Sequence, residues 1–345
     1  MRESIAATGL FPDLDLELDG AGDPARPLVF VDLDGRHPES VQALHQTLPL
    51  VVGVLRGPVT SALAPVLDAL TFTLTDAEVP VSATSLVRVA DLDAAIRQLE
   101  TAVSRAPRAA VAGGHLLRHT DPRTVPALAA EAAVFSMLLG GPEFARWLAG
   151  RGNMPPPPAT GRPLVRAIRE GDQLRITLDH PERRNSLSFR MREQLLAAVE
   201  AGAADPDVHV TISGAGSNFC SGGDLAEFGT ASDPVAAYLV RLARAPWRVI
   251  DSIADRVTMR VHGACVGAGA EIAAFGGRVV AVPETSFSFP EIGMGLVPGA
   301  GGTVSVPRRI GRWRSAWLFL TGERLTAETA LRWGLVDEIS ANRAP

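Results

Sequence analysis

One stretch of small and apolar residues that carries a single acid decides the fold: Val261-His262-Gly263-Ala264-Cys265-Val266-Gly267-Ala268-Gly269-Ala270-Glu271-Ile272-Ala273-Ala274. The preceding residues 257–261 predict a β-strand, and the residues around Glu271 predict a short helix that follows directly. A carboxyl in such surroundings loses solvation on folding, and this loss raises its pKa toward neutrality. We therefore interpret Glu271 as an acid/base group. The alternative is a helix residue paired with an arginine.

A second glutamate lies twenty positions further on, in Phe287-Ser288-Phe289-Pro290-Glu291-Ile292-Gly293. Two carboxyls that face one pocket can divide the roles of acid and base between them. The alternative for Glu291 is a turn carboxylate exposed to water.

The composition is that of a globular protein. The chain has 345 residues, of which 46% are apolar and 21% are charged, and its net charge is −5. This leaves ample material for packed cores, and no basic block is long enough to follow a nucleic-acid backbone. The two cysteines, Cys220 and Cys265, suit a reducing compartment. We expect a cytoplasmic protein with no signal or membrane segment, no nucleic-acid partner and no metal site.

Four consecutive prolines, residues 155–158, divide the chain, because such a run neither continues a helix nor enters a sheet. We expect an N-terminal part over residues 1–153, a connector over 154–162 and a C-terminal part over 163–345. Both parts alternate strands with helices, which indicates parallel βαβ units and an α/β fold. In the C-terminal part we expect strands at 164–168, 174–178, 208–212, 257–261 and 278–282, and helices at 192–201, 234–245, 316–320 and 327–333.

The N-terminal part becomes almost wholly helical after residue 90. Strands are expected at 28–33 and 51–55 and helices at 63–69, 91–103, 109–117, 124–139 and 143–149, with Asp91 and Thr124 as helix N-caps. Residues 54–78 also align with 260–284, and Pro65 then takes the place of Glu271. If this repeat is real, the first copy lacks the acid; a few matches in Ala- and Gly-rich segments also arise by chance.

Two glycine-containing turns are candidates for binding an anion. Gly222 and Gly223 follow the strand at 208–212, where paired glycines permit close approach of the backbone to a ligand. The segment 263–269 joins a strand to the helix of Glu271, and the first N–H groups of a helix lack partners within it. One N–H donor from each turn would make an oxyanion hole. An ordinary loop is the alternative for the first turn.

These segments resemble the enoyl-CoA hydratase/isomerase (crotonase) superfamily over about residues 163–340. The resemblance rests on blocks whose order and spacing match: His180 to Leu187, Phe219-Cys220-Ser221-Gly222-Gly223-Asp224-Leu225, Val261 to Glu271, Phe289 to Gly293 followed by Val297-Pro298-Gly299-Ala300-Gly301-Gly302-Thr303, and Gly334 to Glu338. It implies a β-β-α spiral core and an assembly of trimers or hexamers.

The resemblance also implies roles for particular residues. The amides of Gly223 and Ala268 would hold the thioester carbonyl, and Glu271 and Glu291 would position water and protonate the α-carbon. Gly222, Asp224 and Gly299 would help to form the substrate site. No cofactor is implied beyond the coenzyme A of the substrate. Expected activities are hydration or dehydration of an enoyl thioester, with double-bond isomerisation or a non-catalytic subunit as alternatives.

Two departures from the family pattern shape the expectation. Ala226 stands where relatives often carry a lysine that meets CoA phosphates, so a carrier-protein thioester is an alternative substrate. The family's helical tail follows the position of residues 336–338, whereas here residues 87–120 and 128–152 resemble that tail. We therefore expect a degenerate crotonase-like N-terminal region whose helices complete the C-terminal core, within one chain or between protomers.

Overall fold

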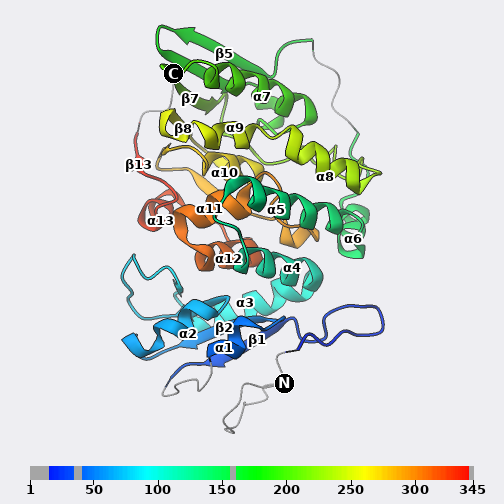
Figure 1. Ribbon diagram of the computed structural model, residues 1–345, viewed down its shortest axis with the longest axis vertical. Coiled ribbons are helices and arrows are strands. Elements are labelled where there is room, and N and C mark those ends of the chain that lie inside the picture. The colour runs from blue at the N-terminus through cyan, green and yellow to red at the C-terminus, as the bar shows by residue number, and fades with distance from the viewer. Residues whose placement is uncertain (1–14, 35–40, 156–160, 342–345) are drawn as a thin grey trace.

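The computed structural model describes residues 15–34, 41–155 and 161–341. Figure 1 shows the N-terminal sheet at the bottom of the long axis and the C-terminal part above it, whereas residues 124–151 of the N-terminal part lie beside the C-terminal part. Both contain parallel strands joined by helices, so the expected α/β class is confirmed. Most of the proline connector, residues 156–160, lies outside the described residues.

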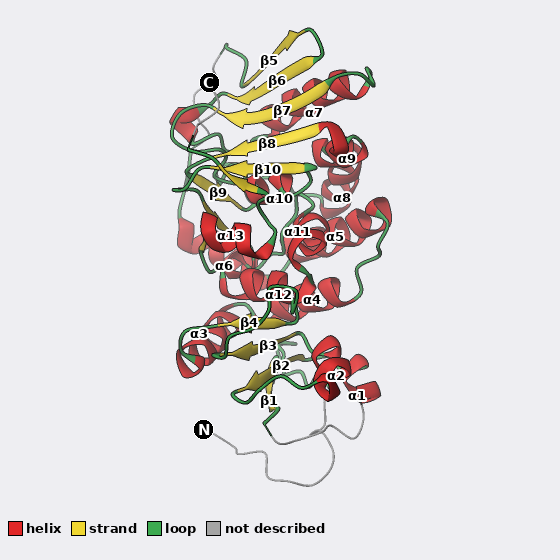
Figure 2. Ribbon diagram, turned by 90° about the vertical axis from the view of Figure 1, so that its left-hand side faces the viewer, coloured by secondary structure: helices red, strands yellow, loops and turns green. Residues whose placement is uncertain are grey.

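The C-terminal part is built on a six-stranded sheet in the order β13-β10-β8-β7-β6-β5. Only β5 is antiparallel to its neighbour, and the other pairs are parallel. Figure 2 shows helices α7 (Phe189–Ala203) and α9 (Pro246–Ser252) along one side of this sheet. The strands are β5 (Val165–Glu170), β6 (Gln173–Leu178), β7 (His209–Gly214), β8 (Val257–Val261), β10 (Arg278–Ala281) and β13 (Glu338–Ile339).

A small second sheet places the segments around the two glutamates side by side. Its order is β12-β11-β9, with β9 (Ala264–Val266) parallel to β11 (Ser286–Ser288) and β12 (Leu325–Thr326) antiparallel to β11. Glu271 follows β9 on α10 (Ala268–Ala273), and Glu291 follows β11. Parallel pairing of β9 and β11 therefore delivers both acids to the same end of this sheet.

The N-terminal part has its own parallel sheet, β1-β2-β3-β4. Its strands are β1 (Leu28–Asp32), β2 (Leu50–Leu55), β3 (Phe72–Thr75) and β4 (Leu86–Arg88), with helices α1 (Val41–His45) and α2 (Ala64–Ala69) between them. The proposed repeat aligns β3 with β10 residue for residue, and it aligns β2 with residues 256–261, which are β8 and the residue before it. A common ancestry of the two segments stays a prediction.

Four helices follow the first sheet and pack on the C-terminal part: α3 (Leu92–Arg105), α4 (Pro107–Arg118), α5 (Thr124–Leu139) and α6 (Pro142–Arg151). Helices α3 and α4 contact α12 (Arg312–Thr321), whereas α5 contacts α8 (Pro234–Ala243) and α11 (Gly302–Ile310). One hydrophobic cluster runs through both parts, from Leu50 to Val336. These helices therefore share a core with the C-terminal strands instead of forming a separate body.

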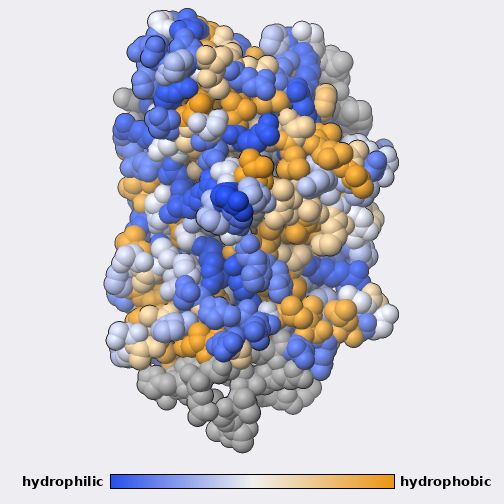
Figure 3. Space-filling view, in the orientation of Figure 1, coloured by the Kyte–Doolittle hydropathy of each residue, from blue (hydrophilic) through white to orange (hydrophobic). Residues whose placement is uncertain are grey.

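Helix α8 has an inner and an outer face. Its inner side packs on α5, whereas Val235 and Leu239 on its outer side are 67% and 56% exposed. Figure 3 shows apolar surface over this helix. Among the described residues no single helix is long and apolar enough to cross a membrane, although α5 and α6 satisfy that test together as a pair bent by 65°.

Of the two helix N-caps predicted from the sequence, one is confirmed and one is wrong. Asp91 caps α3 by accepting a hydrogen bond from the Ala94 N–H. The prediction for Thr124 is wrong, because Arg123 occupies the cap position of α5 and no side chain caps that end. The hydroxyl of Thr124 instead donates to Asp251, so a contact distant in sequence replaced the local one.

Candidate active site

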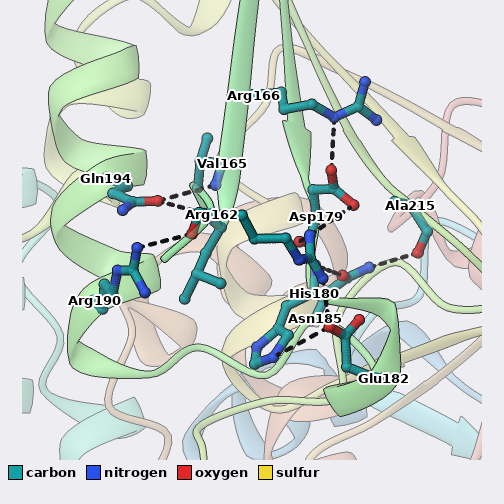
Figure 4. Close-up of polar contacts among 11 residues, drawn as sticks. Arg162, Val165, Arg166, Asp179, His180, Glu182, Asn185, Arg190, Gln194 and Ala215 are labelled. Atoms are coloured by element: carbon teal, nitrogen blue, oxygen red, sulfur yellow. Dashed lines mark hydrogen bonds and ion pairs between the residues drawn. The ribbon is translucent and has the colours of Figure 1, made fainter. Parts of the chain in front are cut away.

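A buried asparagine shapes the first glycine turn. Asn185 accepts a hydrogen bond from the His180 N–H at 2.8 Å and donates to the Ala215 carbonyl at 2.9 Å (Figure 4). It also donates to the Asn218 carbonyl at 2.8 Å. It thereby ties the strand end at residue 180 to the loop that follows β7. The Leu187 N–H then donates to the Gly222 carbonyl at 2.7 Å. Hydrogen bonds from the segment 185–187 thus fix the backbone next to Gly223.

The second turn pairs directly with the first. The backbones of Cys220 and Cys265 pair as an isolated parallel β-bridge, and the Val266 N–H donates to the Cys220 carbonyl at 3.0 Å. A Cβ at Gly222 would lie 3.9 Å from the Ala268 nitrogen, so the two turns are in contact at the predicted oxyanion hole. Within the described part of the chain, neither the Gly223 N–H nor the Ala268 N–H donates a hydrogen bond.

Gly267 shows how closely the second turn approaches an acid. Its φ is +47°, and a Cβ there would lie 2.2 Å from Oε1 of Glu291. Only a residue without a side chain fits this position. The structure therefore brings Glu291 against the same turn that carries the Ala268 amide.

Glu271 is buried in α10, with 1% of its surface exposed. Its Oε2 accepts hydrogen bonds from the Ala300 N–H at 2.6 Å and the Gly302 N–H at 2.8 Å. Burial raises the pKa of Glu271 well above its usual range, and the charges of Glu291 and Glu131 raise it further. The predicted desolvated acid is thus present, and it is held by backbone amides instead of by an arginine.

Glu291 is 8% exposed and lies at the start of the short 3₁₀ turn Ile292–Met294. Burial raises its pKa to about 8. Its Oε2 is buried and has no hydrogen-bond partner among the described residues. A buried carboxyl oxygen without a partner is costly to keep and suits a group that binds a reactant. The alternative of a water-exposed turn carboxylate does not hold.

A third buried carboxylate, Glu131 of α5, was not predicted. Its Oε1 accepts from the Gly301 N–H at 2.7 Å, and its Oε2 accepts from the N–H and the hydroxyl of Thr303 at 2.8 and 2.7 Å. Burial raises its pKa to about 7. Glu131 is the only charged residue in α5. The signal that singled out Glu271, one acid in an apolar helix, would have found it.

The remaining predicted residues lie around this centre with different roles. The Asp224 carboxylate is buried and engaged by Arg183 at 2.7 Å, by the Ser186 hydroxyl and by the Ala226 N–H. It therefore fixes the shape of the first loop. Gly299 packs against Phe135 of α5, whose ring would lie 2.3 Å from a Cβ at that position.

Aromatic residues join the first loop to the N-terminal helices. The Phe228 ring would lie 2.7 Å from a Cβ at Gly223, and its centroid is 5.8 Å from that of Trp147 in α6. Arg151, also in α6, donates to the Leu225 carbonyl. The N-terminal part thus supports both the loop of the first amide and the loop that holds Glu271.

Other residues considered from the sequence are structural. His262 is buried, and its Nε2 lies 3.0 Å from the Gly216 carbonyl oxygen. Both cysteines are buried and unbridged, and burial raises the pKa of Cys220 to about 12. No cluster of metal-ligating side chains occurs in residues 15–34, 41–155 and 161–341.

Comparison with known proteins identifies the family. The family model for enoyl-CoA hydratase/isomerase matches residues 170–344. The 2,3-dehydroadipyl-CoA hydratase of Escherichia coli strain K12 is 35% identical over 167 residues, which cover 48% of this chain and 65% of that protein. The probable enoyl-CoA hydratase EchA14 of Mycobacterium tuberculosis strain H37Rv is 36% identical over 162 residues, which cover 46% and 63%.

A solved structure gives a comparable match. The putative enoyl-CoA hydratase/isomerase from Mycobacterium abscessus is 36% identical, with a TM-score of 0.48 and coverage of 51% of this chain and 70% of that one. The matches to the first two relatives span less than two thirds of their length. Since the family model covers half of the chain, the protein belongs to the enoyl-CoA hydratase/isomerase family.

Proposed function

We propose that the protein adds water to, or removes it from, an α,β-unsaturated acyl thioester. One observation carries this proposal: two buried glutamates, one with an unpartnered carboxyl oxygen, lie beside two turns whose Gly223 and Ala268 amides donate no hydrogen bond to the described chain. The names of the curated relatives agree with a hydratase. Coenzyme A would enter only as part of the substrate, and a carrier-protein thioester is the alternative.

In this mechanism the thioester carbonyl oxygen accepts hydrogen bonds from Gly223 N–H and Ala268 N–H. These donors stabilise the negative charge that develops on the oxygen as the enolate forms. The amides are fixed by the pairing of their turns, so they need little rearrangement when the charge develops. Polarisation of the carbonyl makes the β-carbon electrophilic toward water.

The two acids divide the proton transfers. One carboxylate removes a proton from the attacking water, and the other carboxyl gives a proton to the α-carbon. Like charges in one buried site oppose joint ionisation, so one acid of the pair holds a proton near neutral pH. Burial raises the pKa of Glu291 to about 8 and raises the pKa of Glu271 well above its usual range, so the pair retains a proton near neutral pH.

Turnover of crotonyl-CoA, followed as loss of the conjugated thioester absorbance, tests the proposal. Glu271→Gln and Glu291→Gln should each lower kcat by about 100-fold or more, because each removes one acid/base group. Glu143→Gln is the matched control: this buried glutamate accepts the N–H groups of Arg108 and Ala109 at the start of α4. Unchanged rates in both site variants would exclude the hydratase mechanism, and an inactive wild type would favour a non-catalytic subunit.

Double-bond isomerisation is the second candidate. It is supported by a difference in hydrogen bonding between the two acids. Two amides engage Oε2 of Glu271, whereas Oε2 of Glu291 is unpartnered. As a carboxylate, Glu291 would take a proton from the α-carbon and return it to the γ-carbon, which moves the double bond into conjugation. Conversion of a 3-enoyl-CoA to the conjugated 2-enoyl-CoA, with no hydration of crotonyl-CoA, would select this reaction.

A further inference from the structure

Two carboxylates bind the backbone N–H groups of one loop, and successive N–H groups donate alternately to one carboxylate and to the other. Along residues 300–303, the N–H groups of Ala300 and Gly302 donate to Glu271, whereas those of Gly301 and Thr303 donate to Glu131. All four distances lie between 2.6 and 2.8 Å. The four successive amides at the start of α11 are therefore all satisfied, two by each acid.

The two acids come from different parts of the chain. Glu271 belongs to the C-terminal part, and Glu131 enters from α5 of the N-terminal part, 170 residues before the glycine that it binds. Glu131 is 2% exposed. Its helix is fixed at the same place by Phe135, which packs on Gly299 and lies 3.5 Å beneath the guanidinium carbon of Arg241.

We propose that Glu131 is a positioning residue for Glu271, supplied to the active site by the N-terminal part of the same chain. The inference rests on the proposed function, because it assigns Glu131 to the support of an acid in that mechanism. By binding the two amides that Glu271 does not bind, Glu131 fixes the loop that orients the Glu271 carboxylate. It touches no reacting atom itself.

The physical reason is that the loop has no other anchor for these amides. Without the Glu131 carboxylate, the N–H groups of Gly301 and Thr303 would be buried without acceptors, which is unfavourable. The loop would then change conformation so that the N–H groups of Gly301 and Thr303 reach other acceptors, and this change would also move the N–H groups of Ala300 and Gly302. Glu271 would follow its donors, and a displaced acid loses its alignment with the substrate.

The charge of Glu131 has a separate, measurable consequence. The titratable groups that interact with Glu271 are Glu131 on α5, Glu291 after β11, Arg241 on α8 and the Cys220 thiol of the first turn. Because like charge raises the pKa of a carboxyl, removing the charge of Glu131 should lower the pKa of Glu271. A role confined to general stability would leave that pKa where it is.

Glu131→Gln is the primary test, with Glu143→Gln as the matched control. Glu131→Gln should lower kcat for crotonyl-CoA by about tenfold to 100-fold with little change in KM, and should move the carboxyl-dependent limbs of the kcat–pH profile to lower pH. Glu143→Gln should lower the melting temperature without moving the profile. A folded Glu131→Gln protein with wild-type kcat and profile would overturn the inference.

Two further measurements keep the inference testable if Glu131→Gln does not fold or if the proposed function fails. Thr303→Val removes only the hydroxyl that donates to Glu131, so it should move the profile in the same direction by a smaller amount. Carboxyl titration of ¹³C-glutamate-labelled protein, with the Glu271 signal assigned by Glu271→Gln, requires no turnover. If Thr303→Val leaves the Glu271 titration unchanged, Glu131 does not act through Glu271; if only the wild-type turnover is absent, the proposed function alone fails.

Discussion

Substitution of Gly302 by alanine tests how tightly Glu271 is held. A Cβ at Gly302 would lie 2.6 Å from Cγ and 2.8 Å from Oε2 of Glu271. Carbon atoms in ordinary contact are about 3.5 Å apart or more, so the loop and the acid must separate by roughly 1 Å. Gly302 is helical and its φ is not positive, so the substitution adds no backbone strain of its own.

A displacement of this size has a large expected effect on rate. A misplacement of about 1 Å costs on the order of 100-fold, which corresponds to about 2.7 kcal/mol of transition-state stabilisation. Overpacking of the buried site should also lower the free energy of unfolding by about 1–3 kcal/mol. The assays are kcat for crotonyl-CoA hydration and urea unfolding.

Gly293→Ala is the matched control for this prediction. Gly293 lies two residues after Glu291, and a Cβ there would meet no atom within 4 Å. Its kcat should equal that of the wild type. If Gly302→Ala kept both wild-type kcat and stability, or if Gly293→Ala lost as much activity, the described packing around Glu271 would be incorrect.

Three other perturbations probe the packing, the acids and the cysteines. Phe135→Ala should lower the free energy of unfolding by about 3–5 kcal/mol in urea titrations, because Phe135 packs on Gly299; a loss below about 1 kcal/mol would contradict the joint core. For Glu291, whose pKa is about 8 in the fold against 4.5 for the free group, the associated stability is full below pH 4.5 and is lost as the pH rises through 8. Urea unfolding from pH 4.5 to 8 should therefore show a smaller fall in stability for Glu291→Gln than for the wild type, and equal slopes would refute the raised pKa. Cys220 and Cys265 should resist thiol reagents in the native protein, because both are buried and their thiols have raised pKa values; rapid labelling before unfolding would oppose this.

The sequence was most informative where hydrophobic periodicity and local chemistry agree. The strands at 257–261 and 278–282 and the helix of Glu271 lie where alternation of apolar segments placed them. The apolar residues of both strands are buried, as their sequence patterns predict. The burial of both glutamates followed from the same reasoning, because an acid within an apolar segment has no route to water.

Elements that depend on distant contacts were harder to predict. Helix α11 begins in the glycine-rich segment 299–302 and contains Pro307, both of which argue locally against a helix. Its first amides are satisfied by Glu131 and Glu271, which lie far away in the sequence. A tertiary contact thus stabilises a helix start that local propensity opposes. The pairing of Thr124 with Asp251 replaced a predicted cap for the same reason.

The role of Asp224 also required the folded arrangement. The sequence placed it beside the first amide, whereas only the structure shows that Arg183, Ser186 and the Ala226 N–H occupy its carboxylate. The Ala226 N–H is a local partner, two residues away, whereas Arg183 and Ser186 lie about forty residues earlier, so no local pattern indicates these two.

The most direct test of the central claim is an experimental structure of the protein with acetoacetyl-CoA bound. The thioester oxygen should lie within about 3 Å of the nitrogens of both Gly223 and Ala268, with the carboxylates of Glu271 and Glu291 beside the same acyl chain. A thioester oxygen bound elsewhere, or acids that face separate cavities, would contradict the account.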